Sequence, residues 1–255
     1  MSRKFPRMDA YIGTARMDNL RLQTHVIDHV PKAMNGLRAA FISDVHLRPN
    51  IPTAQLIDCI KRSKADIIFF GGDFSDTHDQ ALRLFAAFEA IHAPLGMYTA
   101  IGNNDTEAFE SAACLRSALK DCGIRLLVNE SIQMDGFCVA GLDDHLHGSP
   151  SERGLFDHRE GYRILLSHYP ILPAQRIDLM LSGHTHGGQF NAFGLTPYAI
   201  GFEGIGKKKH LAPAAVSGLH EIKGTRLLVS KGVGTSRIPM RIGVVPEIHL
   251  LKFEC

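Results

Sequence analysis

Short apolar runs recur along the chain, separated by turn-forming residues such as Gly, Pro, Asn and Asp. Runs of this length that are rich in Ile, Leu, Val and Phe predict buried β-strands. The predicted strands are 39–43, 66–70, 97–101, 138–142, 163–167, 178–182, 226–230 and 247–253.

Between the first of these strands, apolar residues recur at the three- and four-residue spacing of amphipathic helices. The predicted helices are 53–63, 79–92 and 107–121, the last followed by Gly123, a common helix stop. From about residue 124 onward strands dominate. We therefore predict an α/β domain whose second half adds further sheet.

Side chains that commonly bind metal follow five of the predicted strands. They are Asp44 and His46 after 39–43, Asp73 and Asp76 after 66–70, Asn103, Asn104 and Asp105 after 97–101, His168 after 163–167, and His184 and His186 after 178–182. Ligands of open α/β sheets bind outside the carboxyl ends of the strands, so these side chains can converge on one site. A donor set of carboxylates, imidazoles and amides without thiolate suits Mn, Fe, Zn or Mg.

Each of these motifs taken alone has an ordinary explanation. A single Asp-x-His or Gly-Asp-x-x-Asp is commonly a polar surface turn. The sequence GHTHGGQ directly after an apolar run is far more specific. Alternate residues of an extended segment point to the same side, so Asp44 and His46 can grip one ion together, as can His184 and His186. The presence of all five motifs in this order favours a metal site over a set of unrelated polar surface turns.

The composition of the chain argues against several classes of protein. The 255 residues are 45% hydrophobic and 21% charged, which is ordinary for a chain that buries a sizeable core. The net charge of +2 and the lack of interleaved basic and aromatic residues argue against a nucleic-acid binder. The five cysteines lack a CxxC motif, so neither a disulfide framework nor a zinc–thiolate site is expected. With no apolar run approaching 18 residues and no secretory signal in MSRKFPRMDAYIG, we expect a cytoplasmic protein.

In this order, the motifs DVH, GDFSD, GNND, SHYP and GHTH resemble those of the calcineurin-like metallophosphoesterases. The resemblance covers about Leu37 to Phe253. It implies a two-sheet β-sandwich flanked by helices, with 37–255 as the catalytic domain and 1–36 as a lead-in with a first strand packed on it. The segments HVPKAMNGLRAAFISDVHL and LLVSKGVGTSRIPMRIGVVPEIHLL look like a bacterial branch of single-domain phosphodiesterases. That branch is similar to the hydrolases that split UDP-2,3-diacylglucosamine in lipid A biosynthesis.

The same resemblance implies two divalent metal ions, with Mn favoured. Carried over position by position, Asp44, His46 and His186 hold the first ion, Asp73 bridges both, and Asn103, His168 and His184 complete the second. The ions bind the phosphoryl group and activate a water that attacks phosphorus in line, so no protein nucleophile is required. Asp76 is expected to orient a ligating imidazole or to have a structural role rather than to bind metal, and Asp105 is a candidate for a similar role.

One departure from the family pattern affects catalysis. Most members have His after the ligating Asn, whereas this chain has Asn104, and we place Asn104 and Asp105 among the catalytic candidates. An imidazole can pass a proton to the leaving oxygen, whereas an amide can only donate a hydrogen bond. This loss matters least when the leaving group is itself a phosphate, which favours pyrophosphates and activated diesters. His78, His145 and His147 are candidates to replace the missing imidazole, with exposed loop positions as the simpler explanation.

Two further features have both a functional and a structural interpretation. Arg241 could bind substrate phosphate, because a guanidinium suits it, or form a structural ion pair. The run Lys207, Lys208, Lys209 and His210 could meet phosphate or an anionic membrane surface, or be a solvated charge run. This run lies in the glycine-rich segment 187–224, whose part from Phe190 to His210 we expect to cap the site and select the substrate.

The sequence therefore predicts a dinuclear metal-dependent phosphoesterase that hydrolyses a phosphodiester or pyrophosphate, such as UDP-2,3-diacylglucosamine. The alternatives are a non-catalytic interaction module with the same fold, and a nuclease. The expected partner is a small-molecule phosphoester or pyrophosphate. Peripheral contact with the inner face of the membrane is left open, together with the oligomeric state.

Overall fold

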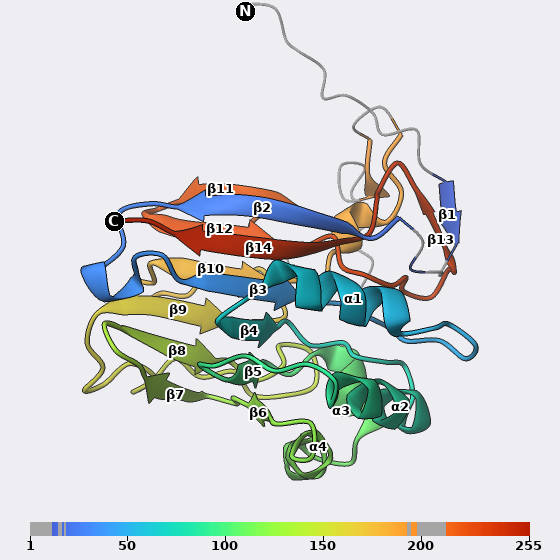
Figure 1. Ribbon diagram of the computed structural model, residues 1–255, viewed down its shortest axis with the longest axis horizontal. Helices are drawn as coiled ribbons and strands as arrows, with labels where there is room; N and C mark the ends of the chain where they lie inside the picture. Colours follow the sequence, from blue (N-terminus) through green and yellow to red (C-terminus); the bar gives the residue numbers. More distant parts are fainter. Residues whose placement is uncertain (1–11, 15–16, 18, 193–194, 198–212) are drawn as a thin grey trace, which may run out of the picture.

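The computed structural model describes residues 12–14, 17, 19–192, 195–197 and 213–255 (Figure 1). These residues form two six-stranded β-sheets, a two-stranded ribbon and helices. Side chains from both large sheets share one apolar core, so the sheets pack face to face. The predicted α/β architecture of a two-sheet sandwich with helices is confirmed. The charge run Lys207–His210 lies outside the described residues.

The first sheet contains the strands that the sequence places before the first three ligand motifs. Its order is β2 (Arg21–Ile27), β14 (Glu247–Phe253), β3 (Arg38–Ile42), β4 (Ile67–Phe70), β5 (Met97–Thr99) and β6 (Ile124–Leu126). From β3 to β6 all neighbours are parallel, whereas β14 is antiparallel to β3 and parallel to β2. The carboxyl ends of β3, β4 and β5 therefore meet at one edge.

The second sheet contains the strands before the last two ligand motifs. Its order is β11 (Gly218–Ile222), β12 (Thr225–Val229), β10 (Leu179–Ser182), β9 (Tyr162–Leu166), β8 (Phe137–Gly141) and β7 (Glu130–Gln133). The central four strands are parallel, and β11 and β7 are antiparallel edges. The separate ribbon pairs β1 (Ile12–Thr14) with β13 (Met240–Ile242).

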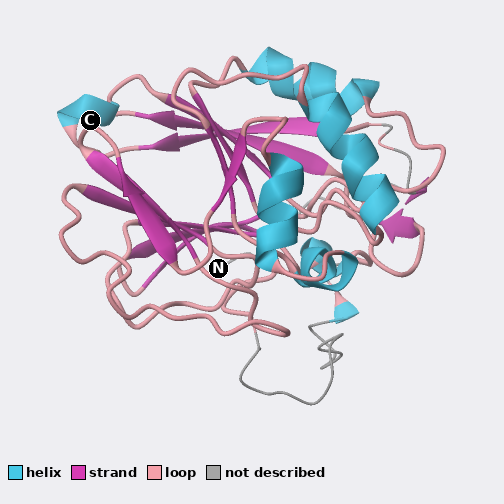
Figure 2. Cartoon of the chain, turned by 90° about the horizontal axis from the view of Figure 1, so that it is seen from below, coloured by secondary structure: helices cyan, strands magenta, loops and turns pink. Residues whose placement is uncertain are grey.

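Alternation along the strands explains the layers. In β3, Phe41 faces the second sheet, where it shares a core with Leu166 and Leu181, whereas Ile42 faces the helices. The helices are α1 (Ala54–Ser63), α2 (His78–Phe88), α3 (Asn103–Ala108) and α4 (Ala112–Leu119). Their apolar faces cover the outer side of the first sheet, and Figure 2 shows the longer helices gathered on that side. None of the described helices combines the length and apolarity that crossing a membrane requires.

The predicted elements differ from the structure in two respects. All eight predicted strands are present, but the short strands β6, β7, β11 and β13 were not predicted, and the lead-in 1–36 contains two strands, β1 and β2, where one was expected. The predicted single helix 107–121 is wrong, because the chain is extended at Phe109 (φ −119°, ψ 141°) and two helices form. The second helix starts afresh because the Ser111 hydroxyl accepts a hydrogen bond from the Cys114 amide at 3.2 Å.

A pair of histidines, the half-buried His25 and the buried His249, joins β2 to β14. His249 is 1% exposed, and its Nδ1 lies 3.0 Å from Nε2 of His25, while its Nε2 lies 3.5 Å from the Glu247 carboxylate. Burial lowers the pKa of His249 to about 4, although Glu247 opposes this effect. The folded protein therefore holds His249 neutral over a range of pH in which an unfolded chain protonates it.

This pair predicts a specific acid sensitivity. The pKa of His249 is depressed below its ordinary 6.5, so its contribution to stability is present above pH 6.5 and is lost as the pH falls towards 4. Between pH 7 and pH 4 the free energy of unfolding should fall by roughly 2 to 3 kcal/mol from this group. Urea unfolding of His249→Gln at several pH values should lack this component. The exposed His29→Gln is the matched control, and a variant that retains the full acid dependence contradicts the prediction.

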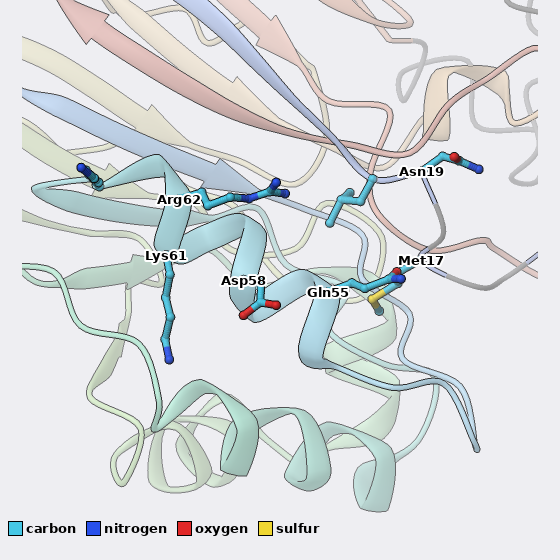
Figure 3. Close-up of a pocket in the computed structure, with 8 residues that line it drawn as sticks. Met17, Asn19, Gln55, Asp58, Lys61 and Arg62 are labelled. Carbon is cyan, nitrogen blue, oxygen red and sulfur yellow. The ribbon is translucent and has the colours of Figure 1, made fainter.

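A cavity of about 620 Å³ lies beside α1 and the segment that precedes β2 (Figure 3). Its lining includes Met17, Asn19, Gln55, Asp58 and Arg62. No predicted metal ligand lines this cavity. The cavity is therefore separate from the predicted metal site.

Candidate metal centre

Loops from both sheets bring the predicted carboxylate and imidazole ligands together. Among the residues that the structure describes, two groups have ligand atoms that all lie within 4.8 Å of one another. The groups are Asp44 with His46 and His186, and Asp44 with Asp73 and His168. The Asp73 carboxylate is central, because its Oδ2 lies 3.4 Å from Nε2 of His46 and 3.3 Å from Nε2 of His168. All five side chains are buried, so the sandwich encloses a compact cluster of potential ligands.

The backbone of this cluster is unusual. Five predicted ligands have left-handed φ values, which are 53° for Asp44, 39° for His46, 57° for Asp73, 68° for His184 and 51° for His186. Non-glycine residues rarely adopt this conformation, and when they do they concentrate at functional sites. Neighbouring glycines allow the close approach: a Cβ at Gly183 would lie 2.1 Å from the Asp44 carboxylate. The loops are therefore shaped to aim their side chains inward.

Hydrogen bonds at Nδ1 fix two imidazoles. The Nδ1 of His168 donates to the Gly71 carbonyl at 2.7 Å, and the Nδ1 of His46 lies 2.6 Å from the Asp76 carboxylate. The sequence prediction that Asp76 orients an imidazole matches this contact. In the neutral form of both rings the proton is on Nδ1, so Nε2 has a free lone pair, and this lone pair points towards Asp73. Lone pairs and a carboxylate that face one another need positive charge between them, so the residues fit divalent cations.

The charges of the cluster indicate the same requirement. Burial opposes the charged form of His168, but Asp73 and Asp44 raise its pKa to about 10. Burial likewise raises the pKa of Asp73, yet His168 and His46 hold it far below its usual range. The buried carboxylates are therefore stable only with positive charge beside them, either from protonated imidazoles or from metal ions.

The remaining predicted ligands lie beside His168. The Nδ1 of His184 is 3.3 Å from Nε2 of His168, and the His184 amide donates to the Asp44 carboxylate at 2.9 Å. The amide oxygen of Asn103 accepts a 3.5 Å hydrogen bond from the Tyr169 hydroxyl. Tyr169 also stacks on the His184 ring, with centroids 3.9 Å apart. Sequence reasoning missed Tyr169, although its position directly after His168 in SHYP was a usable signal.

Asp105 lies beneath the cluster. One of its carboxylate oxygens accepts from the amides of Asp73 at 2.8 Å and Gly102 at 2.9 Å, and the other accepts from the amide of Phe74 at 2.9 Å. Its side chain is 1% exposed. These contacts tie the loop after β4 to the loop after β5. They suit a positioning role rather than direct contact with substrate.

Asn104 contacts the central carboxylate. Its backbone amide donates to Oδ1 of Asp73 at 2.9 Å, and its side-chain Nδ2 donates to Oδ2 at 2.6 Å. The amide side chain therefore lies at the edge of the cluster, where the family pattern places an imidazole. It can hold Asp73 by hydrogen bonds but has no proton to transfer at neutral pH.

Arg241, for which the sequence leaves substrate binding and a structural ion pair open, contacts a backbone carbonyl and the ring of His186. Arg241 is 1% exposed, and its guanidinium donates to the Gly234 carbonyl, with Nε at 2.7 Å. Another guanidinium nitrogen lies 3.3 Å from Nδ1 of His186. The ribbon of β1 and β13 places Arg241 behind the cluster, where backbone carbonyls take up its donors. Its contacts hold His186 and the loop around Gly234.

The three histidines proposed to replace the missing imidazole occupy different places. His78 starts α2 and packs edge-on against Phe109, and His147 pairs with Glu107 at 3.1 Å. His145 lies against Tyr169, with ring centroids 5.5 Å apart. Of the three histidines, His145 is thus the one that contacts Tyr169, the residue that stacks on the proposed ligand His184.

Comparisons with known proteins agree with this geometry. The pattern of the family described as calcineurin-like phosphoesterase matches residues 37–188. An uncharacterized metallophosphoesterase of Aquifex aeolicus is 32% identical over 92% of this chain and 92% of that protein. The Bacillus subtilis protein YpbG is 29% identical over 94% of this chain and 89% of that protein. A Danio rerio transmembrane protein with a metallophosphoesterase domain is 31% identical over 87% of this chain and 54% of that protein.

Proposed function

This chain belongs to the calcineurin-like phosphoesterase family, a family of metal-dependent phosphoric ester hydrolases, and we propose that it cleaves phosphodiester or pyrophosphate bonds with two divalent ions. The observation that carries the proposal is the buried cluster centred on Asp73, within 3.4 Å of His46 and 3.3 Å of His168. In this assignment Asp44, His46 and His186 would hold one ion, Asn103, His168 and His184 would hold the other, and both ions would share Asp73.

The protein groups divide the work as follows. Two divalent ions, when bound, supply positive charge that polarises the phosphoryl group and favours ionisation of an attacking water. Asp76 and the Gly71 carbonyl keep the Nε2 atoms of His46 and His168 turned towards Asp73, where they would bind the ions. Asn104 holds the shared carboxylate through two hydrogen bonds. The donor set lacks thiolate, and Mn²⁺ is the first ion to test among Mn, Fe, Zn and Mg.

The presence of an amide rather than an imidazole at Asn104 also indicates which class of substrate to expect. General acid help at the leaving oxygen is commonly worth about 10²–10⁴-fold, and an amide does not provide it. A leaving phosphate, or an activated alcohol, departs without a proton. We therefore place the substrate among pyrophosphates and activated diesters, and within them among nucleotide-sugar or lipid-linked pyrophosphates such as UDP-2,3-diacylglucosamine.

The test is a parallel assay of the protein stripped with chelator and reloaded with Mn²⁺. The substrates are bis-p-nitrophenyl phosphate, p-nitrophenyl phosphate, an alkyl phosphomonoester and UDP-2,3-diacylglucosamine. We expect kcat/KM for the diester and the pyrophosphate to exceed that for the alkyl monoester by at least about 10²-fold. A preference for the alkyl monoester contradicts the substrate class. No metal-dependent turnover of any substrate would instead favour the non-catalytic interaction module.

A further inference from the structure

Three of the four imidazoles in the cluster are held by polar groups at the nitrogen remote from the proposed ions. Asp76 holds His46, the Gly71 carbonyl holds His168, and Arg241 lies at Nδ1 of His186. His184 is held in a different way, through its ring face. Tyr169 stacks on it with centroids 3.9 Å apart and an interplanar angle of 25°.

Tyr169 reaches a second proposed ligand of the same ion. Its hydroxyl donates to Oδ1 of Asn103 at 3.5 Å. An amide side chain can present either its oxygen or its NH₂ group, and only the oxygen binds a cation. A hydroxyl that donates to Oδ1 selects the orientation in which the oxygen faces the cluster and leaves its second lone pair for an ion.

Tyr169 is itself rigidly placed. It is 1% exposed, and its carbonyl accepts hydrogen bonds from the hydroxyls of Ser167 at 3.0 Å and Ser182 at 3.5 Å. These serines lie at the carboxyl ends of β9 and β10, which also carry His168 and His184. The His145 ring packs against Tyr169, with centroids 5.5 Å apart. The aromatic ring is thus fixed to the same two strands as the ligands that it contacts.

We propose that Tyr169 is a positioning residue for the second metal ion: its ring orients His184 and its hydroxyl orients Asn103. This inference rests on the ligand assignment of the proposed function. It makes the two metal positions unequal, because the residues proposed for the first ion are Asp44, His46 and His186, and Tyr169 is stacked on none of them. Loss of Tyr169 should therefore weaken the second ion while sparing the first.

The experiment is calorimetric titration of chelator-stripped protein with Mn²⁺ alone, which needs no substrate. Wild type should bind two ions. Tyr169→Phe removes only the hydroxyl and should weaken the second ion about 10-fold, and Tyr169→Leu removes the ring as well and should weaken it up to about 100-fold. In both variants the first ion should bind within about 3-fold of wild type.

Tyr98→Phe is the matched control, because the Tyr98 hydroxyl donates to the Leu95 carbonyl on an exposed turn. It should bind both ions as wild type does. Thermal unfolding of every variant tests folding, and Tyr169→Phe keeps the inference testable if Tyr169→Leu does not fold.

Three results would overturn the inference. If both Tyr169 variants bind two ions with wild-type affinity, this inference is refuted and the proposed dinuclear function is not. Equal weakening of both ions, together with a lower Tm, would show a general structural role and refute it as well. A wild-type protein that binds a single ion refutes both this inference and the dinuclear function proposed above, so the two failures are distinguishable.

Discussion

Replacement of Asp73 by Asn should remove bound metal and activity together. The Asp73 carboxylate lies between the Nε2 atoms of His46 and His168, and it belongs to the cluster from which both proposed ions take ligands. An amide carries no charge and offers one oxygen in place of two, so it offsets the repulsion between two cations far less than a carboxylate does. Loss of a group that only orients a ligand costs 10- to 100-fold, and loss of a shared ligand should cost more than about 10²-fold in kcat/KM.

Two measurements check this result. One is metal content after reloading with Mn²⁺ and dialysis, and the other is turnover of bis-p-nitrophenyl phosphate. Asp79→Asn is the matched control, since the Asp79 carboxylate is fully exposed on α2 and should change neither quantity. Wild-type metal content with wild-type activity in Asp73→Asn would refute the assignment of Asp73 as the shared ligand.

The central strands and most of the ligand cluster could be predicted because their signals are local. The run IIFF of β4 is buried on both faces and is recognisable without knowledge of its neighbours. Each ligand motif follows such a strand directly, so the carboxyl edge of the sheets brings the motifs together. The short strand β11 escaped prediction because its residues are exposed or half-buried, which leaves no apolar run.

The parts that escaped prediction depend on contacts that are distant in sequence. Arg241 contacts His186 across 55 residues, and its burial follows from the pairing of β13 with β1. No property of the sequence IPMR distinguishes such an arginine from one that binds phosphate. Tyr169 is similar, because its role depends on the ring of His184, which another strand supplies. The proposed cap from Phe190 to His210 remains a prediction, since most of it lies outside the described residues.

Asp105 offers the second large expected effect, and it separates a positioning role from a catalytic one. Its two oxygens accept three backbone hydrogen bonds, from Asp73, Gly102 and Phe74. In Asp105→Asn the side chain has one oxygen, so its NH₂ group must face at least one amide N–H. A buried donor left without a partner costs about 1–3 kcal/mol, and hydrogen bonds to a charged acceptor are lost as well. The free energy of unfolding should therefore fall by about 3 kcal/mol.

The same substitution should weaken Mn²⁺ binding by 10- to 100-fold, because the loop that carries Asp73 loses its anchor. At saturating Mn²⁺, kcat should stay within about 10-fold of wild type, since the Asp105 carboxylate is buried and bound to backbone amides. Urea unfolding, Mn²⁺ titration and kcat measured on the same preparation check these expectations. The exposed Asp121→Asn, at the end of the segment after α4, is the control. Wild-type stability and metal affinity combined with a lost kcat would show instead that Asp105 acts on the substrate directly.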